Sequence, residues 1–97
     1  MKINKIKKEL AGNKDYLERN FYIKEIGIFG SFALGVEDNE SDVDVLVDFR
    51  KGHKDLFNYL RLKYYLEDLL KREVDLVPKK AVKTRLKKKI LEQVVYV

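Results

Sequence analysis

The chain has 97 residues, a length that predicts one domain over residues 1–97 and leaves no room for a separate lid or cap domain. Its composition, 45% hydrophobic and 38% charged residues, is that of a folded globular protein and excludes a disordered or fibrous one. There is no cysteine and one histidine, His53, which excludes disulfides, thiolate metal sites, a cysteine nucleophile and sites with two imidazoles. The apolar stretches are too short to cross a bilayer and no secretory signal is recognisable, so we expect no membrane contact and a cytoplasmic location.

The net charge of +5 conceals an uneven distribution of charge along the chain. Residues 36–49 contain six carboxylates and neither Lys nor Arg, so they carry −6 and the rest of the chain carries +11. Carboxylates that repel one another destabilise a fold unless positive charge lies between them. The acidic segment therefore indicates a bound metal ion.

Six segments in chain order carry the periodicity of a helix or a strand. Apolar residues at helical spacing predict three helices, over residues 2–19, 54–72 and 81–95, the first weakened at Gly12 and Asn13. Runs of β-branched and aromatic residues predict three strands, over residues 23–29, 42–49 and 73–77, the last stopped by Pro78. The predicted fold class is therefore α+β, a small mixed sheet flanked by helices.

The long predicted helix has two apolar stripes. The main stripe, which we expect to face the core, consists of Leu56, Leu60, Tyr64, Leu66 and Leu70. The second stripe consists of Leu62, Tyr65 and Leu69. It either packs on another side of the core or forms a surface for an apolar partner.

Asp42 and Asp44 lie two residues apart on a predicted strand, so both side chains point to the same face. At this spacing two carboxylates either raise each other's pKa or share a hard divalent cation such as Mg²⁺. Asp75, in the third predicted strand, adds a third carboxylate if that strand pairs beside the second. Asp48 lies on the same predicted face as Asp42 and is a rival for this role. Three carboxylates suffice for a site with two metal ions.

Gly30 and Ser31 follow the first predicted strand, at the start of a short helical turn. Backbone N–H groups and the serine hydroxyl can hold phosphate oxygens there, and a glycine lets a phosphate approach the main chain. Ten residues separate Ser31 from Asp42, which lets the phosphate cradle and the acidic pair lie at the same end of adjacent strands. This arrangement predicts a polyphosphate substrate with its metal. The alternative is that Ser31 is a plain turn residue or helix cap.

The Gly-Ser pair, the ten-residue gap and the Asp-x-Asp motif resemble the nucleotidyltransferases of the DNA polymerase beta-like superfamily. The chain looks most like the minimal nucleotidyltransferases, the MntA-type antitoxins of HEPN/MNT toxin–antitoxin systems. The resemblance implies transfer of AMP from ATP to a hydroxyl with release of pyrophosphate. In MntA-type relatives the acceptor is a tyrosine of the partner HEPN toxin, so the resemblance also implies a HEPN-type toxin as partner.

Carried onto this chain, the resemblance implies that Gly30 and Ser31 bind the outer phosphates and that Asp42 and Asp44 ligate two Mg²⁺ ions. Asp75 would be the third metal ligand and favour deprotonation of the acceptor hydroxyl. This chain has Leu34 where relatives often carry an arginine, so it lacks a positive side chain near the phosphates. Two other functions remain open: a subunit that neutralises its toxin by contact alone, and a small nucleic-acid-binding domain that uses the basic background.

Overall fold

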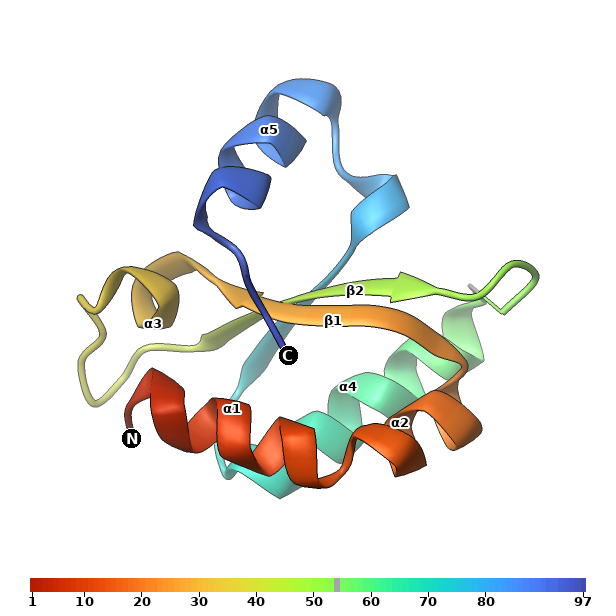
Figure 1. Cartoon of the computed structure of the whole chain (residues 1–97), viewed down its shortest axis with the longest axis horizontal. Helices are drawn as coiled ribbons and strands as arrows, with labels where there is room; N and C mark the ends of the chain where they lie inside the picture. The colour runs from red at the N-terminus through yellow and green to blue at the C-terminus, as the bar shows by residue number, and fades with distance from the viewer. Residues whose placement is uncertain (54) are drawn as a thin grey trace.

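The structure is a computed structural model that describes residues 1–53 and 55–97. Its helices are α1 (Ile3–Gly12), α2 (Lys14–Phe21), α3 (Gly30–Leu34), α4 (Leu56–Leu70) and α5 (Thr84–Gln93), with a 3-10 turn at Lys79–Ala81. Its strands are β1 (Ile23–Phe29), β2 (Val43–Phe49), β3 (Val74–Pro78) and β4 (Val95–Tyr96). Figure 1 shows α1, α2 and α4 on one side of the sheet and α5 on the other. The predicted α+β class, a mixed sheet flanked by helices, is confirmed.

The four strands form one sheet in the order β3-β2-β1-β4. β1 pairs with β2 antiparallel, with Phe29 opposite Asp44. β2 pairs with β3 parallel, with Asp44 opposite Asp75. A parallel pair needs a long crossover, which α4 supplies between β2 and β3. This register brings the end of β1, the start of β2 and the start of β3 to one end of the sheet.

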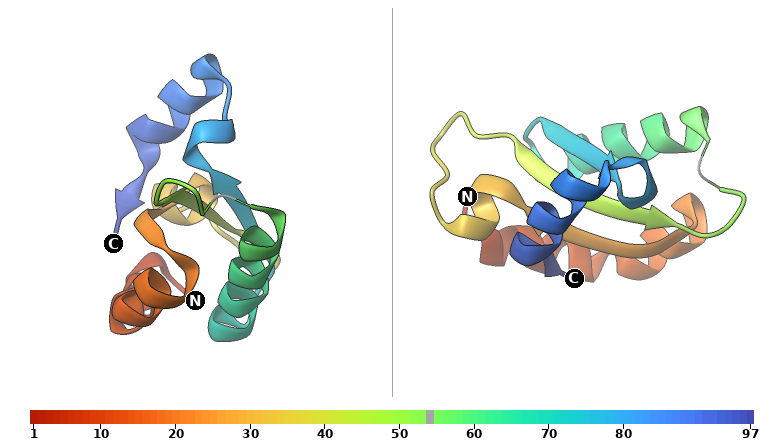
Figure 2. Two further views of the ribbon diagram at one scale, coloured as in Figure 1. Left: turned by 90° about the vertical axis from the view of Figure 1, so that its right-hand side faces the viewer. Right: turned by 90° about the horizontal axis from the view of Figure 1, so that it is seen from above.

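The two faces of the sheet have different cover because successive side chains of a strand point to opposite faces. Val43, Val45 and Val47 of β2 belong to the main core, together with buried residues of α1, α2 and α4. Leu46 points the other way and packs with Ile90 of α5 in a second, smaller core. The left view of Figure 2 shows these two helical layers with the sheet between them. The even-numbered aspartates of β2 therefore lie on the side of α5.

The strand predictions agree with β1 and lie within one residue of the bounds of β2 and β3, whereas two helix predictions need correction. The predicted helix 2–19 is two helices, α1 and α2, divided at Asn13. The predicted helix 81–95 spans only Thr84–Gln93, and Val95–Tyr96 form β4, which pairs with Gly27 and Ile28. A Cβ at Gly27 would lie 2.6 Å from Val94 Cγ2, so this glycine leaves room for the closing strand.

The predicted core-facing stripe of the long helix is right for Leu66 and Leu70 and wrong for Leu56 and Tyr64. Leu62, Leu66 and Leu70 are buried, whereas Leu56 is 67% exposed and Tyr64 is 60% exposed. The main stripe was grouped incorrectly, because six residues from position 60 to 66 turn a helix by about 600° and place the two side chains about 120° apart. Helix α4 begins at Leu56, and residue 54, the predicted start, lies outside the described residues.

The second stripe of this helix also belongs to the core. Leu62 is fully buried, and Tyr65 and Leu69 are partly buried against the main core. The second stripe therefore packs mainly on the core, the first of its two alternatives. Among the described residues, no helix is both long and apolar enough to span a membrane.

Candidate active site

Two neighbouring strands, β2 and β3, bring the predicted acidic residues together. Asp44 and Asp75 occupy matching positions on the neighbouring parallel strands β2 and β3, so their side chains point to the same face. Asp42 lies exposed just before β2, two residues upstream of Asp44. We call Asp42, Asp44 and Asp75 the acidic cluster. Asp44 is its most enclosed member, and both neighbours are close enough to change its ionisation.

The pKa of Asp44 is raised from 3.8 to about 6, mainly by burial and to a lesser extent by the negative charges of Asp75 and Asp42. A hydrogen bond between the carboxyl groups of Asp44 and Asp75, which requires a proton, contributes to the same rise in pKa. The three carboxylates at this end of the sheet thus repel one another, and Asp44 keeps its proton to a higher pH than an ordinary aspartate does. A cation bound among them would remove this repulsion.

Position 30 requires a glycine because its backbone lies against the Asp44 carboxylate. Its φ of +70° lies in the left-handed region, and a Cβ at this position would collide with the Asp44 carboxylate. The Gly30 N–H donates to Oε1 of Gln93, at 3.2 Å, which ties the turn to helix α5. The glycine therefore lets the turn after β1 lie directly against Asp44.

Ser31 stands in the single helical turn α3. This turn is preceded by Phe29 as its N-cap and has no side-chain cap, so Ser31 is not a helix cap. The Ser31 carbonyl accepts from the N–H of Val36, at 3.0 Å, which closes the turn. Among the described residues the Ser31 hydroxyl has no hydrogen-bond partner, which leaves it free for a ligand.

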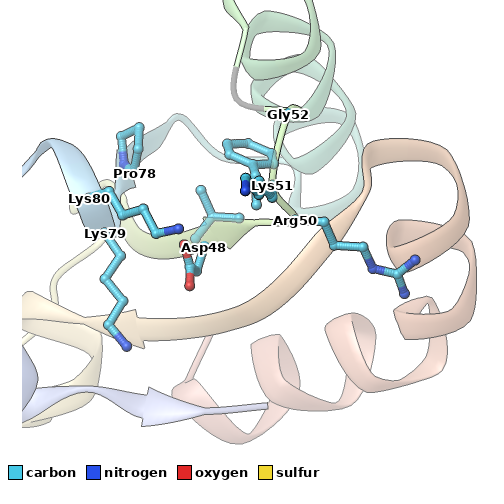
Figure 3. Close-up of a pocket in the computed structure, with 9 residues that line it drawn as sticks. Asp48, Arg50, Lys51, Gly52, Pro78, Lys79 and Lys80 are labelled. Atoms are coloured by element: carbon cyan, nitrogen blue, oxygen red, sulfur yellow. The ribbon is translucent and has the colours of Figure 1, made fainter.

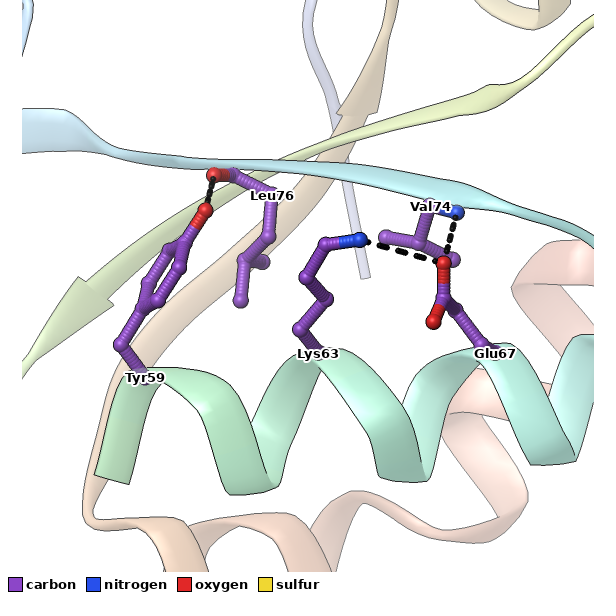
Figure 4. A network of polar contacts seen from close by, with 5 residues as sticks. All are labelled: Tyr59, Lys63, Glu67, Val74 and Leu76. Carbon is purple, nitrogen blue, oxygen red and sulfur yellow. Dashed lines mark hydrogen bonds and ion pairs between the residues drawn. The ribbon is translucent and has the colours of Figure 1, made fainter. Parts of the chain in front are cut away.

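The position of Asp75 is fixed by the contacts of α4 with its neighbours on β3, shown in Figure 4. The Tyr59 hydroxyl donates to the carbonyl of Leu76, at 2.7 Å. Glu67 accepts from the N–H of Val74, at 3.0 Å, and this hydrogen bond lowers the pKa of the Glu67 carboxyl. Asp75 lies between these two anchored residues, so its backbone is held while its side chain faces the opposite side.

The loop that leads to Asp42 is held by Arg72. Its guanidinium donates to the carbonyl of Ser41, at 2.9 Å, and lies 5.3 Å from the ring centre of Phe32 in α3. Arg72 therefore connects the end of α4, the acidic loop and the turn after β1. It orients the segment that carries Asp42 without being part of the acidic cluster.

The donor set of the cluster suits a hard divalent cation. Mg²⁺ binds carboxylate oxygens and commonly leaves further positions to water and phosphate. In the part of the chain that the structure describes, no group of three or more acidic or histidine side chains is already arranged to hold a metal ion. The residues fit the ion by ligand type, charge and location, and Asp42 and Asp75 are exposed to solvent.

Asp48, the rival third carboxylate, lies in another cavity. Figure 3 shows it near the far end of β2, with the side chain of Lys80 close to it and that of Arg50 directed away from it. This cavity is lined by Asp48, Arg50, Lys51, Gly52, Pro78, Lys79 and Lys80. Lys79 also pairs with Glu25, at 3.1 Å. Asp48 is thus four residues away from Asp44 along the strand and is not a member of the acidic cluster.

The nucleotidyltransferase domain family matches residues 4–97 of the chain. The chain belongs to this family, and it is a nucleotidyltransferase. The protein adenylyltransferase MntA of Thermococcus cleftensis is similar to it, with 41% identity over 98% of this chain and 95% of that protein. A solved minimal nucleotidyltransferase has a TM-score of 0.85 at 29% identity, over 98% of this chain and 95% of the other. A solved toxin–antitoxin complex with AMP-PNP has a TM-score of 0.72 at 25% identity, over 88% of this chain and 69% of that chain.

These comparisons confirm the resemblance to minimal nucleotidyltransferases. The structure brings Gly30, Asp44 and Asp75 into one place and sets Asp42 and Ser31 at its border. Sequence reasoning missed Gln93, whose amide holds the Gly30 turn across a separation of 63 residues. No local sequence signal marks such a contact, because it depends on how α5 folds back over the sheet.

Proposed function

We propose that residues 1–97 form one Mg²⁺-dependent protein adenylyltransferase domain that acts as an antitoxin in the cytoplasm. It would transfer AMP from ATP to a tyrosine hydroxyl of a HEPN-type toxin partner. The proposal rests first on the position of Asp44, which is enclosed between Gly30 and Asp75 at the end of the sheet. It is supported by the similarity to the adenylyltransferase MntA and to the toxin–antitoxin complex with AMP-PNP.

The chemistry of this transfer assigns a role to each residue. The acceptor oxygen attacks the α-phosphorus of ATP, the bond from that phosphorus to pyrophosphate breaks, and the hydroxyl proton is lost to water. Bound divalent cations would lower the pKa of the acceptor hydroxyl and balance the charge of the phosphates. Asp42 and Asp44 would hold two such ions, and Asp75 would be the third ligand, beside the acceptor. Ser31 and the backbone of the turn after Gly30 would hold the outer phosphates.

The test is the mass of the partner. A HEPN toxin is incubated with the purified protein, ATP and Mg²⁺, and its intact mass is measured. We expect a gain of one or more AMP masses, which is lost with Asp44→Asn and with replacement of the acceptor tyrosine by phenylalanine. An unlabelled toxin in a stable complex with the wild-type protein would contradict the proposal.

That last outcome defines the second candidate function, inhibition of the toxin by contact alone. Leu34 favours it, because this side chain is 58% exposed at the end of α3, where the family resemblance implies an arginine. Under this alternative, Asp42→Asn and Asp44→Asn leave toxin binding and inhibition unchanged. Nucleic-acid binding through the basic cavity around Asp48 would instead give an affinity for RNA or DNA that falls steeply with salt.

A further inference from the structure

Asp48 is a buried acidic side chain that the proposed reaction does not use. It is 7% exposed, and among the described residues it takes part in no side-chain hydrogen bond and no ion pair. A carboxylate that is withdrawn from water without a hydrogen-bond donor costs free energy. The side chain lines a cavity of about 200 Å³ near the far end of β2, shown in Figure 3. This unpartnered acceptor indicates a ligand with hydrogen-bond donors.

Basic side chains around the same cavity restrict the charge of that ligand. Lys51, Lys79 and Lys80 line it, and Lys79 is already paired with Glu25, at 3.1 Å. Lys51 and Lys80 are exposed, and in the part of the chain that the structure describes neither belongs to an ion pair. These lysines repel a positively charged ligand. The ligand should therefore offer uncharged donors to Asp48 and a negative group to the two lysines.

The size of the cavity favours one flat ring as the buried part of the ligand. Pockets that enclose a drug-sized ligand have volumes of about 300–1,000 Å³, so a cavity of about 200 Å³ suits a single ring with the rest of the molecule at its mouth. Pro78 supplies an apolar wall, and the hydrocarbon stems of the lysines add apolar surface. Figure 3 shows the side chain of Lys80 close to Asp48, so a negative group bound by Lys80 would lie next to a ring bound by Asp48.

A nucleotide combines a flat, uncharged base with a negative phosphate, and guanine is the base that matches a carboxylate. A carboxylate only accepts hydrogen bonds, through two oxygens that lie side by side. Guanine has two donors on one edge, the ring N1–H and the exocyclic amino group, so it can donate to both oxygens at once. Adenine and cytosine offer an amino group beside a ring nitrogen that is itself an acceptor and would face the carboxylate. A lysine ammonium binds the phosphate as a point charge.

We propose that the cavity near the far end of β2 binds a guanine nucleotide, with Asp48 paired to the base and Lys51 and Lys80 to the phosphate. Asp48 lies four residues along the strand from Asp44, and the cavity shares no residue with the acidic cluster. The site is therefore independent of the proposed AMP transfer and stands if that function fails. Its ligand chemistry is a guanine with a phosphate, which a free nucleotide or a guanine of an RNA can supply.

The first test compares nucleoside monophosphates that differ in their donors. Isothermal titration is carried out in EDTA, so that the acidic cluster holds no cation. We expect GMP to bind and IMP, which lacks the amino group, to bind about tenfold more weakly, because one hydrogen bond to a charged group is lost. AMP, which lacks both the N1–H and this amino group, should bind about 100-fold more weakly. No detectable binding of GMP, or equal affinities for GMP and AMP, would overturn the proposal.

The second test changes the base preference through Asp48. Asp48→Asn keeps the size of the side chain and replaces one acceptor by a donor. The variant should bind GMP about tenfold more weakly than the wild type does, and it should bind XMP, which has a carbonyl in place of the guanine amino group, about tenfold more tightly. Circular dichroism checks that the variant is folded. A purely structural role of Asp48 would weaken the binding of GMP and XMP alike, and that result would refute the site.

The lysine contact is tested with a matched pair of variants. Lys80→Ala should weaken GMP binding about tenfold and leave the Kd for guanosine, which has no phosphate, within about twofold of wild type. Lys83→Ala removes a nearby exposed lysine outside the lining and should change neither affinity. Equal losses of GMP affinity in the two variants would show a general effect of charge and contradict the assigned contact.

The two sources of the ligand are separated with short RNAs. A strand of uridines with one central guanosine is titrated beside GMP and beside a strand of uridines alone. Tighter binding of GMP identifies a free nucleotide as the ligand, and tighter binding of the strand with guanosine identifies a guanine of RNA. If all three bind alike, the cavity does not distinguish guanine and the proposal is wrong.

Discussion

Replacing Asp44 by asparagine should stabilise the fold while removing activity. A pKa raised from 3.8 to about 6 means that the ionised Asp44 carboxylate is disfavoured in the folded state. At about 1.4 kcal/mol per pKa unit, the full difference is about 3 kcal/mol. The side chain is partly in contact with water, and screening reduces the expected gain for Asp44→Asn to about 1–2 kcal/mol. For a domain of this size, the Tm should rise by about 5–10 °C.

The sign of the pH dependence follows from the direction of the shift. The folded pKa of Asp44 lies above its unfolded value. Protonated Asp44 therefore costs the wild-type fold nothing below pH 3.8, and the fold loses stability as the pH rises through about 6 and the carboxyl ionises. The advantage of Asp44→Asn is therefore small near pH 4 and largest near pH 8.

Urea unfolding at these two pH values, with EDTA present, measures the difference. The control is Asp68→Asn, an exposed carboxylate on α4 whose replacement should change stability by less than about 0.5 kcal/mol. A variant less stable than wild type at pH 8, or an equal gain in the control, would refute the reasoning.

Three further predictions follow from the same contacts. Gly30→Ala should destabilise the fold by about 1–3 kcal/mol in thermal melts, because the new Cβ collides with Asp44. The control is Gly35→Ala, which has a similar φ but no atom within 4 Å of the new Cβ and should cost about 1 kcal/mol. Equal losses would contradict the contact. Asp75→Asn should lower AMP transfer by at least about 100-fold, while Asp48→Asn, in the other cavity, should leave the rate nearly unchanged in the mass assay. Tyr59→Phe should cost about 1 kcal/mol in urea unfolding, because it removes the hydrogen bond to Leu76, and an unchanged stability would show that this bond does not anchor β3.

The sequence predicted the sheet well because its strands have strong local patterns. Ile23–Phe29 and Val43–Phe49 are dense in β-branched and aromatic residues and end at polar turns, so period and composition agree. The place of Asp75 beside Asp44 followed once the third strand was paired with the second. The acidic residues of the site could therefore be named before their geometry was known.

The features that the sequence did not predict depend on tertiary packing. β4 has two residues, and it forms because the free edge of β1 lies within reach of the chain after α5. The buried side of α4 was misassigned because this helix is apolar on several sides, so counting apolar positions alone did not select one. The contact of Gln93 with the Gly30 turn requires α5 to fold back over the sheet, and no local motif encodes that.

Our central proposal is that divalent cations held by the acidic cluster, two in the proposed mechanism, join this cluster to a bound triphosphate. It is tested most directly by a crystal of the protein soaked with AMP-PNP and Mn²⁺, with data collected at the manganese edge. We expect anomalous density between the side chains of Asp42, Asp44 and Asp75, in contact with the phosphates. A bound nucleotide with no manganese among these three carboxylates would contradict the account.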